Sequence, residues 1–242
     1  MKLYNFIFNK NKNKIILGNV VVHSNSILIG DPCYLDNWEE GLIEINGIQN
    51  GKYPVLATVI DRKGDKRIGL IEVIFADDII SHTSSLGELI VDSATGSVLD
   101  KSGLQSVVTV GPERIGEISG RRHQELAEKV KDRFGIDYTI ENEYTSVFIG
   151  PVDEMMETDI NNFIREIDEM YYVFIKTNNT SDGIIRSLEQ NYVNTYTYSD
   201  FLLPDNRTNV ISFSTGDGDG TYEILGHYNK NKLCKISMDF LV

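Results

Sequence analysis

The sequence contains little cysteine: Cys33 and Cys234 are the only two in 242 residues, and they do not form a Cys-x-x-Cys pair. This excludes a disulfide-rich secreted scaffold and a zinc site built from closely spaced cysteine pairs. Nor do any two of the four histidines stand four positions apart. We expect reduced thiols. Cys234 lies on the apolar face of a strand whose other face is polar, so it is predicted to lie in the core.

Long hydrophobic runs are also missing. No apolar stretch approaches the roughly 18 residues that a membrane-spanning helix needs. Residues 1–8 lack both the apolar segment and the small-residue cleavage site of a signal peptide. We therefore expect a cytoplasmic protein that does not enter a membrane.

Positive charge is in short supply. The chain has 23 basic and 36 acidic residues, which gives a net charge of −13. Binding along a phosphate backbone needs a basic surface, so we expect no nucleic-acid partner. A protein partner with a basic surface, or a cation, is compatible with this charge, and so is an acidic surface that serves solubility alone. The composition indicates no particular oligomeric state.

The patterning that is present predicts the fold. Both ends of the chain show the alternation of half-buried antiparallel strands, whereas the middle shows helical spacing over 120–134, 158–175 and 182–192. We predict an α+β fold with a mostly antiparallel β scaffold, sandwich-like or barrel-like. Residues 1–103 and 205–242 would form this scaffold, and residues 104–204 a helix-rich insertion or subdomain.

Two segments of the scaffold resemble each other. Residues 50–75 and 219–240 both read as Gly-x-Tyr, a strand, a polar turn and a second strand that ends in an aromatic residue. We predict that each segment is a β-hairpin and that both belong to one sheet system.

The loop STGDGDGTY, residues 214–222, is the most unusual segment. Asp217 and Asp219 on a glycine-rich backbone would suit calcium or magnesium. The EF-hand pattern fails, because Tyr222 stands where it needs glycine and Tyr228 where it needs an acid. A phosphate-binding loop is excluded because no Gly-Lys-Ser/Thr and no helix follows. Two alternatives stay open, namely a divalent-cation site and a tight turn that enters a strand.

Other candidates lie in two further loops. Asp31 and Tyr34 flank a proline that ends a strand, and Asp92 and Ser93 follow another strand. We predict ligand-binding roles for these four residues and for Tyr222.

Cys33 and His227 are candidate catalytic residues, since a thiol needs a base that approaches it in space. No complete catalytic signature, such as Gly-x-Ser-x-Gly, accompanies them.

Four segments carry a resemblance to a known family. They are DPCYLDNWEEGLIEINGIQNGKYPVLATVI, RIGLIEVIF, LIVDSATGSVLD and NVISFSTGDGDGTYEILGHYNKNKLCKISMDF. In this order they resemble the uncharacterised bacterial family catalogued as domain of unknown function 4241, over residues 18–102 and 205–242. The chain departs from the family pattern at Glu223, where proline is frequent, and at His227, where an aromatic pair is usual. The segment 103–204 is long for the family. The resemblance implies a shared fold and motif cluster, and it implies no substrate.

These observations lead to two functional hypotheses. The first is a non-enzymatic binding protein, such as an immunity or antitoxin-like protein or a phage- or defence-related interactor. The alternative is a cation-dependent hydrolase or small-ligand-binding protein, in which Asp31, Asp92, Asp217 and Asp219 converge on calcium or magnesium.

Overall fold

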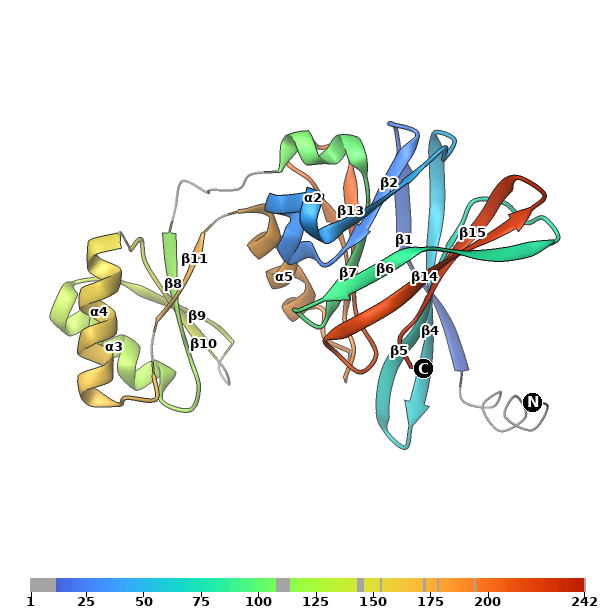
Figure 1. Ribbon diagram of the computed structural model, residues 1–242. Helices are drawn as coiled ribbons and strands as arrows, with labels where there is room; N and C mark the ends of the chain where they lie inside the picture. The colour runs from blue at the N-terminus through green and yellow to red at the C-terminus, as the bar shows by residue number, and fades with distance from the viewer. Residues whose placement is uncertain are drawn as a thin grey trace. The chain divides into compact units, whose positions relative to one another are not determined.

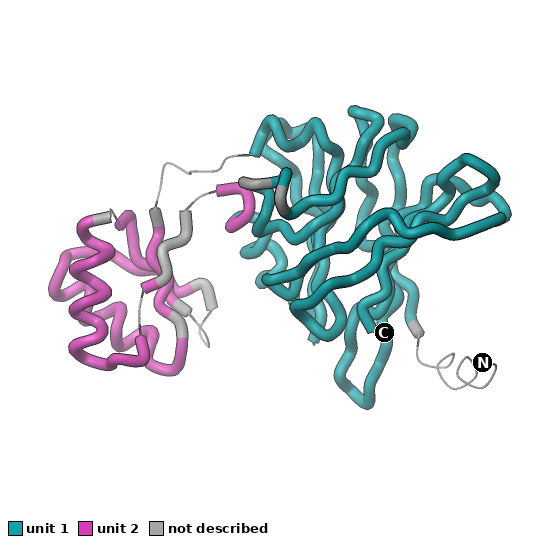
Figure 2. Tube along the Cα trace, in the orientation of Figure 1, with its two compact units in different colours: residues 1–107, 183–242 teal, residues 108–182 magenta. Residues whose placement is uncertain are grey.

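The computed structural model describes residues 12–107, 114–142, 146–152, 154–171, 173–177, 179–193 and 195–241. The chain divides into two compact units (Figure 2). Unit 1 comprises residues 1–107 and 183–242, and unit 2 comprises residues 108–182. Within the described residues, none of the helices is both long enough and apolar enough to cross a membrane.

Unit 1 contains two antiparallel sheets (Figure 1). The larger has six strands in the order β1 (Lys12–Val22), β4 (Gly51–Arg62), β5 (Asp65–Ile74), β15 (Lys232–Asp239), β14 (Gly220–Asn229) and β6 (His82–Val91). The smaller has five strands in the order β12 (Tyr198–Leu202), β13 (Asn209–Ser214), β7 (Thr95–Asp100), β2 (Ser26–Gly30) and β3 (Leu42–Asn46).

The main core of unit 1 lies between these two sheets. Buried aliphatic residues from both sheets form one cluster, among them Val55 and Ile71 from the larger sheet and Ile29 and Val98 from the smaller. The alternation of strand side chains makes this possible, because each sheet turns one apolar face inwards. The architecture is therefore that of a β-sandwich.

Short helices cover the outer face of the smaller sheet. They are η1 (Pro32–Asn37), α2 (Trp38–Gly41), η2 (Lys101–Ser106) and α5 (Thr180–Gln190). A second apolar cluster, which includes Leu28, Leu99, Ile184 and Leu188, joins this face to α5.

Unit 2 contains a four-stranded sheet and two helices. The strand order is β11 (Phe174–Thr177), β8 (Arg114–Ser119), β10 (Ser146–Ile149) and β9 (Tyr138–Asn142), accompanied by α3 (His123–Phe134) and α4 (Glu154–Ile167). Helix α3 ends at Gly135, which adopts φ +69° as its C-cap, at the predicted position. Helix α4 begins and ends earlier than the predicted 158–175. In the sequence, residues 145–149 read as a strand, which corresponds to β10, but the pattern did not reveal the rest of this sheet.

The prediction of an α+β fold with antiparallel sheets is confirmed. Both predicted hairpins form: β4 pairs with β5 and β14 with β15. The two hairpins lie side by side, because β5 also pairs with β15 (Figure 1).

Unit 1 is internally two-fold. The larger sheet reads β1-β4-β5 from one edge and β6-β14-β15 from the other, and the smaller sheet contains β3-β2 and β13-β7 in matching positions. Helix η1 follows β2 as η2 follows β7. The first half therefore runs from β1 to β5. The second half comprises β6, β7, η2 and β13 to β15, with α5, β12 and unit 2 inserted before β13.

The registers of the strands agree with this symmetry. Val22 lies opposite Gly51 in the first half, and Val91 lies opposite Gly220 in the second. Both halves carry their β-bulges at matching places, including one at Leu17 in β1 and one at Leu86 in β6. The pseudo-two-fold axis passes between residues that face each other across the halves, Ile29 and Val98 in one sheet and Glu72 and Ser237 in the other.

Candidate functional site

Asp31 is the best-connected of the predicted site residues. Its side chain is fully buried, directly after β2. One carboxylate oxygen accepts the backbone N–H groups of Asp92 and Ser93 at 2.9 and 2.8 Å. The other accepts the Cys33 N–H at 2.9 Å and the Ser93 hydroxyl at 2.7 Å. The carboxylate thus caps the N-terminus of η1 and also binds the turn between β6 and β7.

Asp100 plays the same part in the other half. It is also fully buried, it follows β7, and it caps η2 by accepting the Ser102 N–H at 3.0 Å. Its second oxygen accepts the His23 and Ser24 N–H groups at 2.8 and 3.0 Å and the Ser24 hydroxyl at 2.9 Å. These hydrogen bonds hold the pKa of Asp100 below its ordinary value, although burial acts in the opposite direction. Asp31 therefore belongs to a repeated structural device.

The predicted pair Tyr34 and Asp92 is brought together. The Tyr34 hydroxyl donates a hydrogen bond to the Asp92 carboxylate near the surface. That bond, together with the negative charge of the carboxylate, raises the pKa of Tyr34 to about 12. The phenol is consequently protonated at neutral pH and acts here as a donor.

Asp219 also has a counterpart. Its Oδ1 accepts the Ala94 N–H at 2.7 Å, and in the first half the Asn50 Oδ1 accepts the Asn25 N–H at 3.0 Å. Ala94 and Asn25 are equivalent turn residues, with φ of +54° and +57°. Because a neutral amide serves in one half, the charge of Asp219 is not needed for this contact.

Asp217 forms an ion pair that the other half lacks. Its carboxylate lies 2.8 Å from the Arg62 guanidinium, and both side chains are about half exposed, at 55% and 45%. Exposed pairs of this kind contribute little to stability. The positive charge beside the Asp217 carboxylate is therefore the Arg62 guanidinium.

The three predicted loops do meet, through backbone contacts. Asp31 accepts hydrogen bonds from the Asp92–Ser93 turn. Ala94 contacts the loop of residues 214–222 twice: its N–H donates to Asp219, and its carbonyl accepts the Thr215 N–H at 2.9 Å. Yet in the part of the chain that the structure describes, no three His, Cys, Asp or Glu side chains are grouped so as to hold a metal ion. The arrangement is that of interlocked turns.

The two candidate catalytic residues lie in different elements of unit 1. Cys33 is exposed in η1, after β2 of the smaller sheet. His227 lies in β14 of the larger sheet, where its Nε2 is 2.7 Å from the Ser237 hydroxyl and its Nδ1 is 3.1 Å from the Thr83 hydroxyl. Burial and the nearby Lys235 lower the pKa of His227. Its partners are therefore hydroxyls of neighbouring strands.

The polar cluster beside His227 was not predicted. Glu72 of β5 is buried and lies 2.6 Å from both the Lys14 and the Lys235 ammonium groups. Burial acts to raise its pKa, but the two lysines hold it below the ordinary value. This ion triad lies at the pseudo-two-fold axis, where Ser237 is the counterpart of Glu72.

Tyr222 belongs to an aromatic pair that occurs in both halves. Its ring meets Phe240 edge to face, with centroids 4.9 Å apart, and its hydroxyl donates to the Gly218 carbonyl at 2.8 Å. In the first half, Tyr53 meets Phe75 at 5.0 Å and donates to the Gln49 carbonyl at 2.5 Å. The Gly-x-Tyr motif thus anchors the start of each hairpin.

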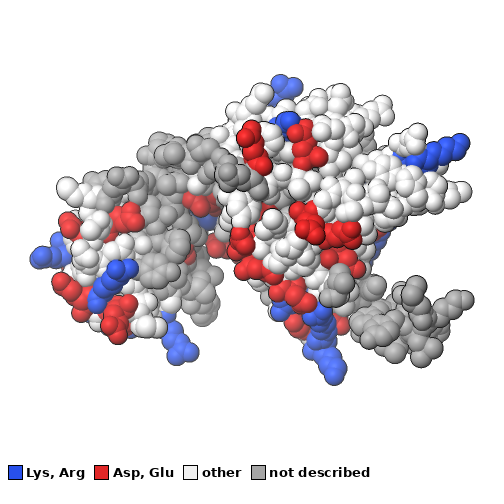
Figure 3. All heavy atoms as spheres, viewed as in Figure 1, with Lys and Arg blue, Asp and Glu red and all other residues white. Residues whose placement is uncertain are grey.

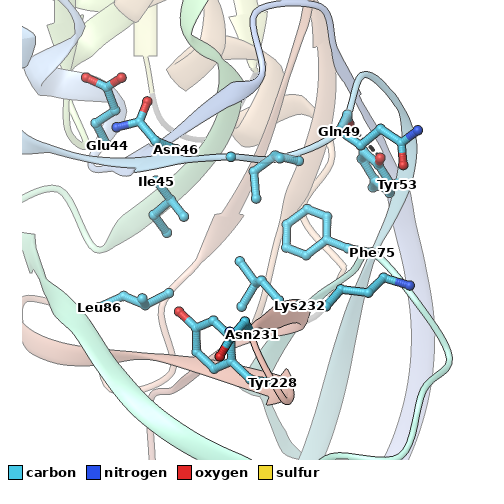
Figure 4. Close-up of a pocket in the computed structure, with 13 residues that line it drawn as sticks. Glu44, Ile45, Asn46, Gln49, Tyr53, Phe75, Leu86, Tyr228, Asn231 and Lys232 are labelled. Atoms are coloured by element: carbon cyan, nitrogen blue, oxygen red, sulfur yellow. Dashed lines mark hydrogen bonds between the residues drawn. The ribbon is translucent and has the colours of Figure 1, made fainter.

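A cavity of about 520 Å³ distinguishes the two symmetry-related sides of the sandwich. It lies between the sheets beside β3 and β6, and Figure 4 shows Tyr53, Phe75, Leu86 and Tyr228 around it. Polar side chains, including those of Asn46 and Gln49, stand along its rim. The sequence analysis did not single out this region.

The place that the pseudo-two-fold axis relates to this cavity is filled. Phe213 and Phe240 are buried there, whereas their counterparts on the cavity are the smaller Ile45 and a half-buried Phe75. Similarly, Leu17 is buried but its counterpart Leu86 is only half-buried. We call the side with the cavity the open side of the sandwich and its equivalent the closed side.

No protein-family model, no curated protein and no solved structure matches this chain. The resemblance to domain of unknown function 4241 therefore stays a prediction.

Proposed function

We propose that this chain is a non-enzymatic binding protein that recognises another protein through the open side of unit 1. The observation that carries the proposal is the difference between the two sides of a two-fold sandwich. On the closed side Phe213 and Phe240 are fully buried and Tyr222 is half-exposed, whereas the open side leaves all three of Tyr53, Phe75 and Tyr228 half-exposed around a cavity. Half-exposed aromatic groups around a concavity are typical of binding surfaces.

The state of the acidic residues supports binding over catalysis. A catalytic carboxylate or a cation ligand needs an oxygen that faces a substrate or an ion. The oxygens of Asp31 accept four hydrogen bonds from the protein itself, and Asp217 pairs with Arg62. The alternative of a cation-dependent hydrolase draws no support from this arrangement.

Charge supports a basic partner. The net charge is −13. Figure 3 shows acidic side chains gathered across the middle of this view of unit 1 and basic side chains at its margins. Such a distribution speeds association with a positively charged protein. An acidic inhibitor of the immunity or antitoxin type fits this description.

The test is capture of a partner from a native lysate by the tagged full-length chain, compared with two variants. Leu86→Lys places a charge in the cavity, where we expect it to abolish capture. Ile16→Lys makes the same change on β1, at a side chain that is 66% exposed, and we expect capture to persist. Melting curves of both variants check that the fold is retained.

If no protein is captured stoichiometrically, the proposed function is wrong. If both variants capture equally, the partner does not use the open side, and the proposal fails in its location.

A further inference from the structure

We propose that the outer edge of β3 binds an extended segment of the partner as an additional antiparallel strand, whose bulky apolar side chain enters the neighbouring cavity. This inference rests on the proposed function and specifies how the partner is held. Strand β3 is the last strand of its sheet, and among the described residues it pairs only with β2. An unpaired edge presents backbone N–H and C=O groups that another chain can bind.

The protein itself contains the precedent for this mode of binding. Strand β13 is the counterpart of β3, and its outer edge is paired with β12, which has no counterpart in the first half. Tyr198 of β12 lies opposite Phe213, the counterpart of Ile45. Among the described residues, no strand takes the corresponding position beside β3, which we call the vacant edge.

The strand register identifies the backbone groups at the vacant edge. Ser214 of β13 donates its N–H to the Thr197 carbonyl at 2.9 Å, just before β12. Alternate residues of a strand direct their N–H groups to the same side, so Ser212 also faces β12. Thr95 and Ser26 are equivalent residues of the two halves. Ser214 lies opposite Thr95 and Asn46 lies opposite Ser26, so Ser214 corresponds to Asn46 and Ser212 to Glu44. The N–H groups of Glu44 and Asn46 therefore point to the vacant edge.

The side chains on the open side have room for such a strand. On the closed side, the Asp200 carboxylate of β12 comes so close to Gly18 that a Cβ atom there would lie 2.6 Å from it. Gly87 is the counterpart of Gly18, and the nearest atoms to a Cβ built on it belong to Ile43 at 3.4 Å or more. Within the part of the chain that the structure describes, no group lies beside Gly87 as Asp200 lies beside Gly18.

The cavity indicates which side chain the segment carries. Tyr198 packs against the core between the sheets on the closed side. A residue opposite Ile45 would point the same way, into the cavity lined by Tyr53, Phe75 and Tyr228. Its volume of about 520 Å³ accepts a large aromatic or aliphatic group. We therefore infer an extended segment with an aromatic or large aliphatic residue at that position.

The first test measures the edge itself in the free full-length chain. Amide hydrogen exchange followed by NMR compares Glu44 and Asn46 with their counterparts Ser212 and Ser214. We expect exchange at the two β3 positions to be faster by about 100-fold or more, since only the outward N–H groups of β13 donate to a neighbouring strand. Equal protection at the four positions would overturn the proposal, because the β3 edge would then be closed.

The second test uses random twelve-residue peptides displayed on phage and panned on the full-length chain. Enriched sequences should alternate apolar and polar residues and share one aromatic or large aliphatic position. Synthetic copies should lose about tenfold or more in affinity with Glu44→Pro, which removes the outward N–H. Glu44→Ala removes the side chain and keeps the N–H, and should lose less than about threefold.

A further variant does not depend on proline. Ile45→Phe copies the residue of the closed side and fills the cavity, so it should weaken the peptides about tenfold with no loss of melting temperature. Protection of the Glu44 and Asn46 amides by the bound peptide completes the expected result.

Three outcomes would count against the proposal: no sequence is enriched, enriched peptides bind Glu44→Pro as well as wild type, or light scattering shows a dimer that Glu44→Pro dissociates. The last would mean that a second copy covers the edge. Failure of this inference can be told apart from failure of the proposed function. If Leu86→Lys abolishes partner capture and Glu44→Pro does not, the proposed function holds and the added strand is wrong.

Discussion

Replacing Asp31 by alanine should destabilise unit 1 strongly. The substitution removes the acceptor of three backbone N–H groups and one hydroxyl, all bonded at 2.7–2.9 Å to a fully buried carboxylate. An orphaned buried donor costs about 1–3 kcal/mol. The turn that supplies most of these donors is partly exposed, so water will satisfy some of them. We expect a loss of about 3–5 kcal/mol in the free energy of unfolding, a large part of the roughly 5–15 kcal/mol of a typical domain.

The assay is urea denaturation followed by the fluorescence of Trp38, the single tryptophan, which lies in unit 1. Asp100→Ala should cost a similar amount, since Asp100 accepts an equivalent set of hydrogen bonds in the other half. Asp217→Ala is the matched control, and we expect it to change the free energy of unfolding by less than about 1 kcal/mol because its ion pair is exposed.

The outcome distinguishes a structural carboxylate from a cation ligand. Carboxylates gathered for a cation repel one another when the cation is absent, so removing one would stabilise the metal-free protein. A loss below about 1 kcal/mol for Asp31→Ala, or a gain, would refute the reasoning that joins the two halves through Asp31 and Asp100.

Three further predictions follow from the same contacts. Because the two lysines lower the folded-state pKa of Glu72, the stability that Glu72 contributes should be complete above the unfolded pKa of about 4.3 and decline as the pH falls through the folded value. The difference in unfolding free energy between wild type and Glu72→Gln, measured from pH 7 to pH 3, should therefore shrink only on the acid side. A constant difference would contradict this. In a spectrophotometric titration, Tyr34→Phe should remove a phenol with a pKa of about 12, and Asp92→Asn should return that pKa towards 10.0; an unchanged titration with Asp92→Asn would disprove the hydrogen bond. Millimolar calcium or magnesium should shift the melting temperature by less than about 1 °C, since Asp217 is paired with Arg62; a larger shift that Asp217→Ala abolishes would restore the cation site.

Much of the architecture was predictable because local patterns carry it. Alternating side chains indicated the antiparallel strands, and the repeated Gly-x-Tyr indicated two related hairpins, each of which begins with a tyrosine that bonds a nearby carbonyl. Helix α3 could be placed because its last turn needs a residue such as Gly135 that tolerates positive φ. In unit 2 the sequence indicated a strand at residues 145–149, which matches β10, but the other strands could not be recognised, since four- to six-residue strands carry few alternations.

The candidate residues show the opposite case. The sequence pattern could place Asp31, Asp92, Asp217 and Asp219 in loops, but it could not show which hydrogen-bond donors lie beside their carboxylate oxygens. Asp219 was a candidate cation ligand because it stands in a glycine-rich acidic loop, yet Asn50 makes the same bond to the equivalent turn of the first half. The chemistry of a carboxylate is decided by its neighbours, and these come from segments more than fifty residues away in the chain.

The sequence by itself therefore determined the two hairpins, helix α3 and the acidic charge, because each depends on residues close together in the chain or on a sum over all of them. Only the tertiary structure decided that unit 1 consists of two symmetric halves, that β12 closes one side, and that Ile45 stands where the other half has Phe213. These features depend on the pairing of distant strands, and a comparison of the halves needs the strand register. The cavity beside β3 arises from that difference.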